Sequence, residues 1–175
     1  MHLQLGSATI RPWSLDDLPS LVHHANDFAI WQQLRDRFPW PYTDDSGRAF
    51  LSMVTSEPDA MVWAIEVDGH AAGGIGLERQ SDVERVSAEI GYWLGQSYWN
   101  RGIVTHAVRS VTAHAFQAFE LSRIFALPFA DNVASQRVLE KAGYVVEGRL
   151  RQSAIKDGRL KDQIMYAAYR LAAGA

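Results

Sequence analysis

The chain has 175 residues, of which 47% are hydrophobic, and 17 Lys and Arg against 20 Asp and Glu give a formal net charge of -3. These values predict one globular domain over residues 1–175 and no basic surface for nucleic acid. The absence of cysteine excludes disulfides, thiolate metal sites and a cysteine nucleophile. No apolar stretch approaches the ~20 residues of a membrane span, so we expect a soluble, cytoplasmic protein with neither a membrane nor nucleic acid as partner.

Alternating strand and helix patterns begin near the N-terminus. A short strand is predicted over residues 8–12. Ser14 then precedes a segment in which Leu15, Leu18 and Val22 recur at helical spacing, which predicts a capped helix.

The next segment, LRDRFPWPYT at residues 34–43, is interrupted by prolines. Proline pushes the preceding residue away from helical angles, so we expect an aromatic loop here. A further helix is predicted to follow, with Asp44 or Asp45 as its cap, and to run to about Ser56.

The middle of the chain is rich in strand patterns. Two apolar runs, near 60–67 and 70–79, are joined by Asp68-Gly69, a pair typical of hairpin turns. A third strand is predicted over 88–95. The run GGIG at 73–76 resembles part of a dinucleotide fingerprint, but no helix follows it, so we interpret it as a bend or bulge in a strand.

The second half predicts a helix over 101–119, a strand over 123–129 and a helix over 132–142. The order strand, helix, strand implies a parallel pair with a right-handed crossover. A second Asp-Gly turn, Asp157-Gly158, precedes a last strand.

The segment YWNRGIVTHA, residues 98–107, lies between a predicted strand and the long helix. Backbone N–H groups and the positive end of the helix dipole converge at such a place, which favours an anion. Gly102 would let a ligand approach closely, and Arg101 adds positive charge. The alternative is an ordinary helix start, in which Asn100 is a cap and Arg101 points into solvent.

A second segment, ADNVASQRVLEKAGY at residues 130–144, follows the next strand. Together the two segments resemble the GNAT superfamily of acetyl-CoA-dependent acetyltransferases, in particular the branch of bacterial Rim-type N-terminal acetyltransferases of ribosomal proteins. The resemblance extends over nearly the whole chain, from TIRPW to KDGRLKDQIMY. It implies an α/β (α+β mixed) domain, whose central mixed, mostly antiparallel sheet contains a splayed parallel strand pair and carries helices on both faces.

The resemblance also implies an acetyl-CoA site. The family's pyrophosphate motif falls on Trp99, Gly102 and Val104, of which only Gly102 has the usual residue type. Val104 puts a branched side chain where glycine or alanine normally stands. The residues implied to bind acetyl-CoA are Tyr92, Trp93, Leu94, Trp99, Asn100, Arg101, Gly102, Ile103, Val104, Thr105, Asn132, Ser135, Arg137 and Lys141. As surface cations, Arg137 and Lys141 could equally be solvated.

Three catalytic residues follow from the same resemblance. The Leu94 N–H would face the thioester carbonyl and stabilise the developing oxyanion. Ser135 would lie near the sulfur, although Leu139 stands where many relatives have a tyrosine, so the general acid is Ser135, another tyrosine or solvent. Glu89 is the candidate base for the attacking amine, and its alternative role is an edge glutamate paired with a cation.

The loop at 34–43 would lie at the acceptor end of the site. Its aromatic rings and carboxylate would suit a protonated amine. The candidate acceptor-binding residues are Trp31, Arg35, Asp36, Phe38, Trp40 and Tyr42. Phe38 and Trp40 could equally attach the loop to the core.

The predicted function is transfer of acetyl from acetyl-CoA to a primary amine, of a protein N-terminus or a small molecule, by direct attack in a ternary complex. The alternatives are a non-catalytic acyl-CoA-binding domain and a fold that binds no coenzyme A. The six histidines lack partners at ligand spacing, so no metal is expected. Many members of the family form homodimers, and the sequence leaves the oligomeric state open.

Overall fold

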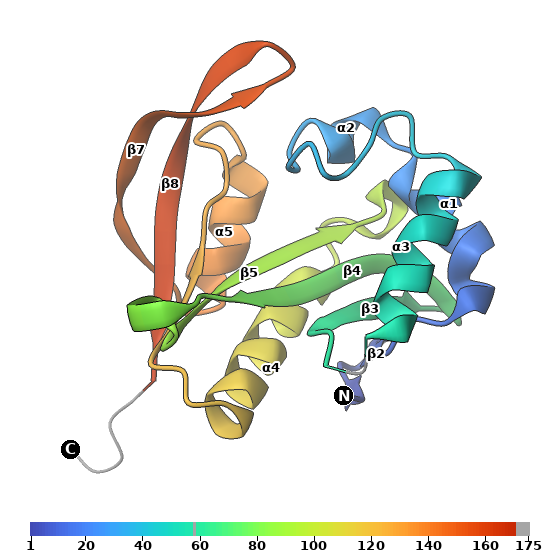
Figure 1. The fold of residues 1–175 in the computed structure, drawn as a ribbon, viewed down its shortest axis with the longest axis horizontal. Helices are drawn as coiled ribbons and strands as arrows, with labels where there is room; N and C mark the ends of the chain where they lie inside the picture. The colour runs from blue at the N-terminus through green and yellow to red at the C-terminus, as the bar shows by residue number, and fades with distance from the viewer. Residues whose placement is uncertain (58, 171–175) are drawn as a thin grey trace. The chain divides into compact units, whose positions relative to one another are not determined.

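The strands pair into one eight-stranded mixed sheet in the order β1-β2-β3-β4-β5-β6-β8-β7. Figure 1 labels the helices and most of these strands. This computed structural model describes residues 1–57 and 59–170. The strands are β1 (Leu3–Gln4), β2 (Ala8–Arg11), β3 (Val62–Val67), β4 (His70–Arg79), β5 (Ser87–Leu94), β6 (Arg123–Ala126), β7 (Val145–Lys156) and β8 (Arg159–Tyr169). The helices are α1 (Leu18–Ala25), α2 (Phe28–Trp31), α3 (Asp44–Ser56), α4 (Ile103–Ala118) and α5 (Val133–Lys141), with short helical turns η1 (Leu15–Asp17), η2 (Asp82–Glu84) and η3 (Gln96–Tyr98).

The residues fall into two compact units. The first comprises Met1–Gly76 and Tyr92–Ala107, and the second comprises Leu77–Gly91 and the chain from Val108 onward. The pairs β1–β2, β2–β3, β3–β4, β6–β8 and β7–β8 are antiparallel, whereas β5 and β6 are parallel. This confirms the predicted mixed, mostly antiparallel sheet with one parallel pair. No helix among the described residues combines the length and the apolar character that a membrane crossing requires.

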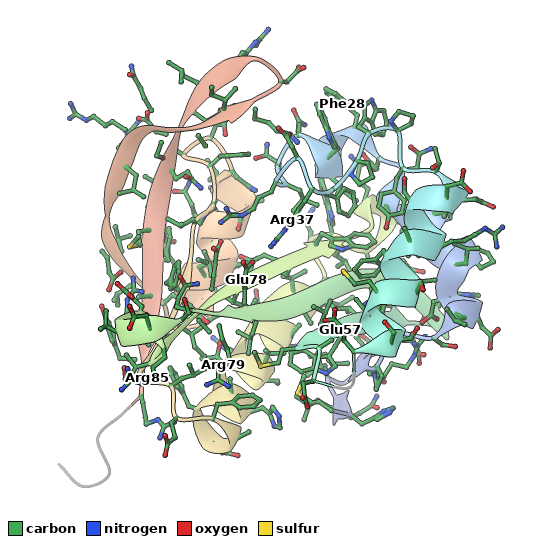
Figure 2. All side chains as sticks on the ribbon, in the orientation of Figure 1. Phe28, Arg37, Glu57, Glu78, Arg79 and Arg85 are labelled. Atoms are coloured by element: carbon green, nitrogen blue, oxygen red, sulfur yellow. The ribbon has the colours of Figure 1, made fainter. Side chains whose placement is uncertain are left out.

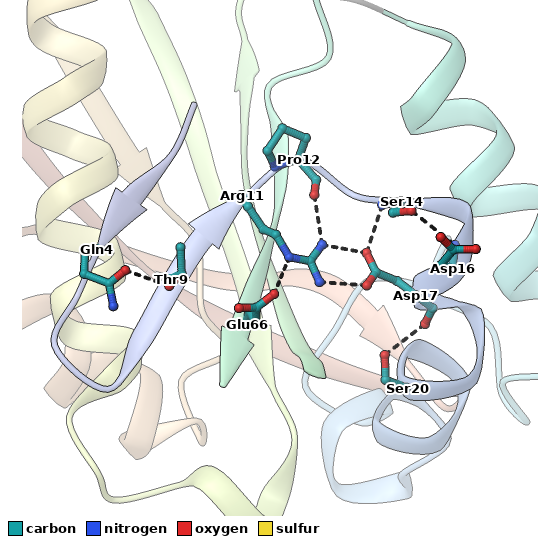
Figure 3. A network of polar contacts seen from close by, with 9 residues as sticks. All are labelled: Gln4, Thr9, Arg11, Pro12, Ser14, Asp16, Asp17, Ser20 and Glu66. Carbon is teal, nitrogen blue, oxygen red and sulfur yellow. Dashed lines mark hydrogen bonds and ion pairs between the residues drawn. The ribbon is translucent and has the colours of Figure 1, made fainter. Parts of the chain in front are cut away.

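In the first unit, the side chain of Arg11 joins a strand to the start of a helix (Figure 3). Its guanidinium donates two hydrogen bonds to Asp17, at 2.7 and 2.8 Å, and its Nε donates to Glu66 on β3 at 2.5 Å. Hydrogen bonding to Asp17 raises the pKa of Arg11 above its ordinary value. Asp17 also accepts from the Ser14 N–H and completes a capping box with Ser14, so the predicted cap is confirmed.

The helices of the first unit pack closely where α3 carries a glycine. A Cβ on Gly47 would lie 2.7 Å from Leu18 Cδ1 and 3.0 Å from Val22 Cγ2 of α1. The cap of α3 is Thr43, whose Oγ1 accepts from the Ser46 N–H, and not Asp44 or Asp45 as predicted. Both aspartates lie in the first helical turn instead, where carboxylates favour the dipole.

In the second unit, β5 and β6 run parallel from Ser87 opposite Arg123 to Glu89 opposite Phe125. The predicted strand over 123–129 ends at Ala126. Proline has no N–H for a ladder, and after Pro128 the pairing continues only as an isolated bridge between Phe129 and Gln163.

The helices and the last hairpin of the second unit are joined by polar contacts. An Arg109 guanidinium nitrogen on α4 donates to the carbonyl of Lys141 in the last turn of α5. The hydroxyls of Thr112 on α4 and Tyr144 lie 2.7 Å apart, and both residues are buried. The turn at Asp157-Gly158 joins β7 to β8 with positive φ at both residues, as predicted.

Replacing Asp17 by alanine should lower the free energy of unfolding by about 2–4 kcal/mol, because it leaves a half-buried guanidinium without its main partner and removes a helix cap. The matched control is Asp16→Ala in the same turn, at an exposed position, which should change stability by less than about 0.5 kcal/mol. Urea unfolding measures both. If both variants lost the same free energy of unfolding, the ion pair between Arg11 and Asp17 would not be what stabilises the start of this helix.

Candidate functional site

The site begins at a bulge in β4. Ile65 of β3 pairs with Gly73 and Glu66 pairs with Ala71, so Ala72 is the extra residue. Its carbonyl accepts a hydrogen bond of 2.8 Å from the Gly95 N–H, just beyond β5. The bulge therefore lies directly before the glycine run at 73–76, where a bend or bulge was predicted, and residues 73–76 themselves pair with β3 in regular register.

Gly73 allows the backbones of β4 and β5 to approach one another. A Cβ on Gly73 would lie 2.4 Å from the carbonyl oxygen of Trp93 and 3.0 Å from Leu94 Cα. The last residues of β5, which the family resemblance assigned to the acyl donor, are therefore held against β4 by backbone contacts. Leu94 is buried, and Tyr92 and Trp93 are half-buried.

The side chain of Trp99 connects the segment that follows β5 back to the end of that strand. Trp99 donates its Nε1–H to the carbonyl of Leu94 at 2.7 Å, across the turn η3. This bond occupies the only polar atom of the Trp99 side chain. The Trp99 side chain therefore stabilises this turn through its hydrogen bond to the Leu94 carbonyl. The residue is 42% exposed, so the face of its ring is the part that could contact a ligand.

Two left-handed residues precede α4. Asn100 has a φ of 61° and Gly102 a φ of 75°. Left-handed angles cannot continue into a right-handed helix, so α4 begins at Ile103 and not at Arg101 as predicted. The Gly102 carbonyl accepts the hydrogen bond of the His106 N–H at 3.1 Å, which makes Gly102 the N-cap. Asn100 is therefore not the N-cap that the alternative expected, whereas Arg101 is exposed, as that alternative expected.

A glycine N-cap has a direct chemical consequence. The usual caps are side-chain oxygens that accept hydrogen bonds from the first-turn N–H groups, and Gly102 has no side chain. The N–H groups of Ile103, Val104 and Thr105 lie in that first turn, at the positive end of a 16-residue helix. A Cβ on Gly102 would meet nothing within 4 Å, so the space beside Gly102 itself is open.

Arg101 adds positive charge beside this turn, and the helix accommodates the unusual Val104. The guanidinium of Arg101 lies 5.4 Å from the ring centroid of Tyr98, in a cation–π arrangement. Val104 is half-buried within regular helix, so its branched side chain fits beside the turn without changing the backbone. Ile103 is 3% exposed and anchors the turn in the core.

The second unit holds α5, on which the resemblance placed Asn132 and Ser135. Asn132 is its N-cap and its Oδ1 accepts from the Ser135 N–H at 3.1 Å, so the amide nitrogen is the polar atom left to face a ligand. Leu139 is fully buried, so the position at which many relatives have a tyrosine is part of the core. Arg137 and Lys141 are exposed.

The structure also settles on which face of β5 Glu89 lies. Its neighbours Ala88 and Ile90 are buried at 0% and 2% exposure. Successive side chains alternate between the faces of a strand, so Glu89 lies on the opposite face from these core residues. It is half-buried there and has interaction partners of its own.

The predicted acceptor residues separate into two groups. Phe38 packs against Tyr42 and against Trp93, with ring centroids 4.9 and 5.6 Å away. Tyr42 is 4% exposed, and burial raises its pKa to about 12. We therefore assign Tyr42 to the core, while Phe38 attaches the loop to the end of β5.

The other group is an exposed aromatic cluster. The ring centroids of Trp31 and Trp40 lie 6.3 Å apart, and the ring centroid of Phe28 on α2 lies within 5.6 Å of both. Figure 2 labels Phe28 at α2. Phe28 is 48% and Trp40 41% exposed. Sequence reasoning missed Phe28, although its spacing of three residues from Trp31 on a helix is a signal that could have found it. Arg35 and Asp36 lie exposed on the same loop.

Among the residues that the structure describes, no group of three His, Asp or Glu side chains could hold a metal ion. The first turn of α4, in the first unit, is instead chemically suited to an anion. Its donors are backbone N–H groups and one guanidinium.

A family model described as an acetyltransferase (GNAT) domain matches residues 8–145. The uncharacterized N-acetyltransferase YoaA of Bacillus subtilis is 38% identical over 95 residues, which are 54% of this chain and 53% of that protein. The ribosomal-protein-serine acetyltransferase of Escherichia coli is 31% identical over 108 residues, which are 62% of this chain and 60% of that protein. The chain therefore spans about half the length of YoaA and 60% of the Escherichia coli protein.

Among solved structures, RimL, a ribosomal L7/L12 alpha-N-protein acetyltransferase in complex with coenzyme A, matches with a TM-score of 0.84. The sequence identity is 21%, and the match covers 97% of this chain and 98% of that chain. At this identity the likeness concerns the fold, and it agrees with the predicted α/β architecture.

Replacing Gly73 by alanine should lower the free energy of unfolding by about 1–3 kcal/mol, because the new Cβ must displace the Trp93 carbonyl and push β5 away from β4. Gly148→Ala in β7 is the matched control, since a Cβ there would meet nothing within 4 Å. Chemical unfolding of both variants measures the difference. Equal stability of the two would refute the close backbone contact.

Proposed function

Since the chain belongs to the GNAT acetyltransferase family, we propose that it transfers the acetyl group of acetyl-CoA directly to a primary amine, either of a protein N-terminus or of a small molecule. The observation that carries this proposal is the first turn of α4. Its N-cap is a glycine in the left-handed region, which has no side chain of its own to occupy the backbone donors of the turn.

Acetyl-CoA is the donor substrate, and its diphosphate suits this turn. The N–H groups of Ile103, Val104 and Thr105 would bind the phosphate oxygens, and Arg101 would balance their charge. The pantetheine arm would lie along Tyr92, Trp93 and Leu94. On the second unit, the resemblance assigns Asn132 and Ser135 to the arm, and Arg137 and Lys141 to the adenosine phosphates.

The reaction requires a neutral amine, whose nitrogen attacks the thioester carbonyl carbon while a base accepts the amine proton. The tetrahedral oxyanion collapses, the C–S bond breaks and coenzyme A leaves as the thiolate. Glu89 is the proposed base, and the Leu94 N–H is the proposed donor to the oxyanion. The chain has no cysteine, which supports direct transfer without an acyl-cysteine intermediate.

The positions of two tyrosines reduce the number of candidates for the general acid. Tyr144 is buried against Thr112, and burial raises its pKa. Tyr166 donates to Glu140 at 2.9 Å, and its burial and that contact raise its pKa to about 12. Both hydroxyls are engaged inside the second unit, so the proposed proton donors to the departing thiolate are Ser135, a tyrosine other than these two, or solvent.

The acceptor would meet the loop between α2 and α3. Aromatic rings and the Asp36 carboxylate attract a protonated amine before it loses its proton. Trp31 and Trp40 belong to the exposed aromatic cluster, which supports an acceptor-binding role for them. The Escherichia coli relative acts on a ribosomal-protein serine, as its name states, which supports a protein N-terminus as the first acceptor to test.

The test measures acceptor-dependent release of free thiol from acetyl-CoA, with a panel of N-terminal peptides, polyamines and aminoglycosides. Saturating acetyl-CoA should also stabilise the protein by about 2–4 kcal/mol in thermal unfolding. Thiol release with one acceptor class identifies the substrate. Stabilisation without release for any amine would support the non-catalytic alternative, and no stabilisation would contradict acetyl-CoA binding altogether.

Gly102→Glu should abolish acetyl-CoA binding, because it puts a bulky negative group beside the diphosphate donors. Gly158→Glu is the control, since its φ of 69° strains a side chain in the same way and a Cβ there also meets nothing within 4 Å. Isothermal titration compares the two, and Gly158→Glu should bind acetyl-CoA like the wild type. Unchanged affinity of Gly102→Glu would remove the turn from the site.

Glu89→Gln should lower kcat by about 100-fold at neutral pH, as for the loss of a general base, and leave acetyl-CoA affinity unchanged. The control is Glu84→Gln, which removes the same charge from the exposed turn η2. Steady-state rates over pH 6–9 with the best acceptor measure both. A pH–rate profile of Glu89→Gln that matches the wild type would exclude Glu89 as the base.

A further inference from the structure

His24 lies at the end of α1 and packs on the segment that leads into α4. A Cβ on Gly95 would lie 2.7 Å from His24 Nδ1 and 3.1 Å from its Cγ. The imidazole therefore rests directly on the Gly95 backbone, whose N–H is also held by the hydrogen bond to the Ala72 carbonyl. Only a glycine at position 95 leaves room for this ring.

The same imidazole also contacts the next aromatic residue of the segment. His24 and Tyr98 form an edge-to-face pair with ring centroids 5.5 Å apart. The other contact of the Tyr98 ring is the Arg101 guanidinium, at 5.4 Å. The three side chains form a continuous row from α1 to the residue that precedes Gly102.

The histidine is uncharged in this row at neutral pH. Burial lowers the pKa of His24, and the neighbouring His23 and His70 lower it further. A neutral ring places no second positive charge beside Arg101. The ring contacts of the row therefore orient the Arg101 guanidinium, which supplies the positive charge beside the first turn of α4.

We propose that His24 is a positioning residue for the diphosphate of acetyl-CoA, which it serves by holding Gly95 and Tyr98 so that Arg101 stays beside the first turn of α4. This inference rests on the proposed acetyl-CoA site. His24 touches none of the proposed diphosphate donors, so it acts through Tyr98 and Arg101.

His24→Ala should weaken acetyl-CoA binding about tenfold, which is the loss expected for one charge-assisted contact. Isothermal titration measures the dissociation constant, and phosphorus NMR of the complex should show shifted diphosphate resonances beside an unchanged 3′-phosphate resonance. His114→Ala, which removes a histidine that contacts Phe119 in the other unit, should bind like the wild type.

A double-mutant cycle tests the route through Arg101. In an Arg101→Ala background, His24→Ala should change the dissociation constant by less than about twofold. Tyr98→Leu breaks the row while His24 stays in place. It should weaken acetyl-CoA binding as His24→Ala does, and this effect should also vanish in the Arg101→Ala background. The test therefore remains valid even if His24→Ala folds poorly.

Three results would overturn the inference. The first is that both His24→Ala and Tyr98→Leu bind acetyl-CoA with wild-type affinity. The second is that their effects on the dissociation constant add fully to that of Arg101→Ala. The third is that the diphosphate and 3′-phosphate resonances shift equally in the His24→Ala complex. If the wild-type protein itself does not bind acetyl-CoA, the proposed function fails, which is a different outcome.

Discussion

The first unit depends on one guanidinium that joins two carboxylates. Arg11 binds Asp17 and Glu66, and it thereby fixes the direction in which α1 leaves β2. The opposite end of α1 carries His24, whose ring supports the segment from Gly95 to Tyr98. A series of contacts therefore connects the ion pair at the start of α1 with the segment that leads into α4.

Most of the fold could be predicted because the signals are local. The hairpin at Asp68-Gly69, the cap at Ser14 and the parallel pair around the α4 crossover all follow from turn chemistry and apolar spacing. The short β1 and the long β7 were not predicted. β1 has only two residues, and most side chains of β7 are exposed, so neither has the alternation of a half-buried strand.

The turn before α4 could be predicted only in part. Glycine at position 102 indicated a close approach, but the sequence could not show that Asn100 is left-handed and that Gly102 itself is the cap. These facts depend on the bond from Gly95 to the bulge at Ala72 and on the indole of Trp99. Such contacts join residues that no short-range pattern connects, and the same holds for the cluster of Phe28, Trp31 and Trp40.

If the proposed function holds, the glycine cap of α4 makes the lifetime of the folded protein depend on the supply of acetyl-CoA. In the free protein, water must satisfy the first-turn donors that a serine or aspartate would otherwise bind, so the helix start is less stable than it could be. On the proposed function, acetyl-CoA supplies the missing acceptors. The folded population would then rise and fall with the cellular acetyl-CoA concentration, and a starved cell would expose this enzyme to proteolysis before a fed one.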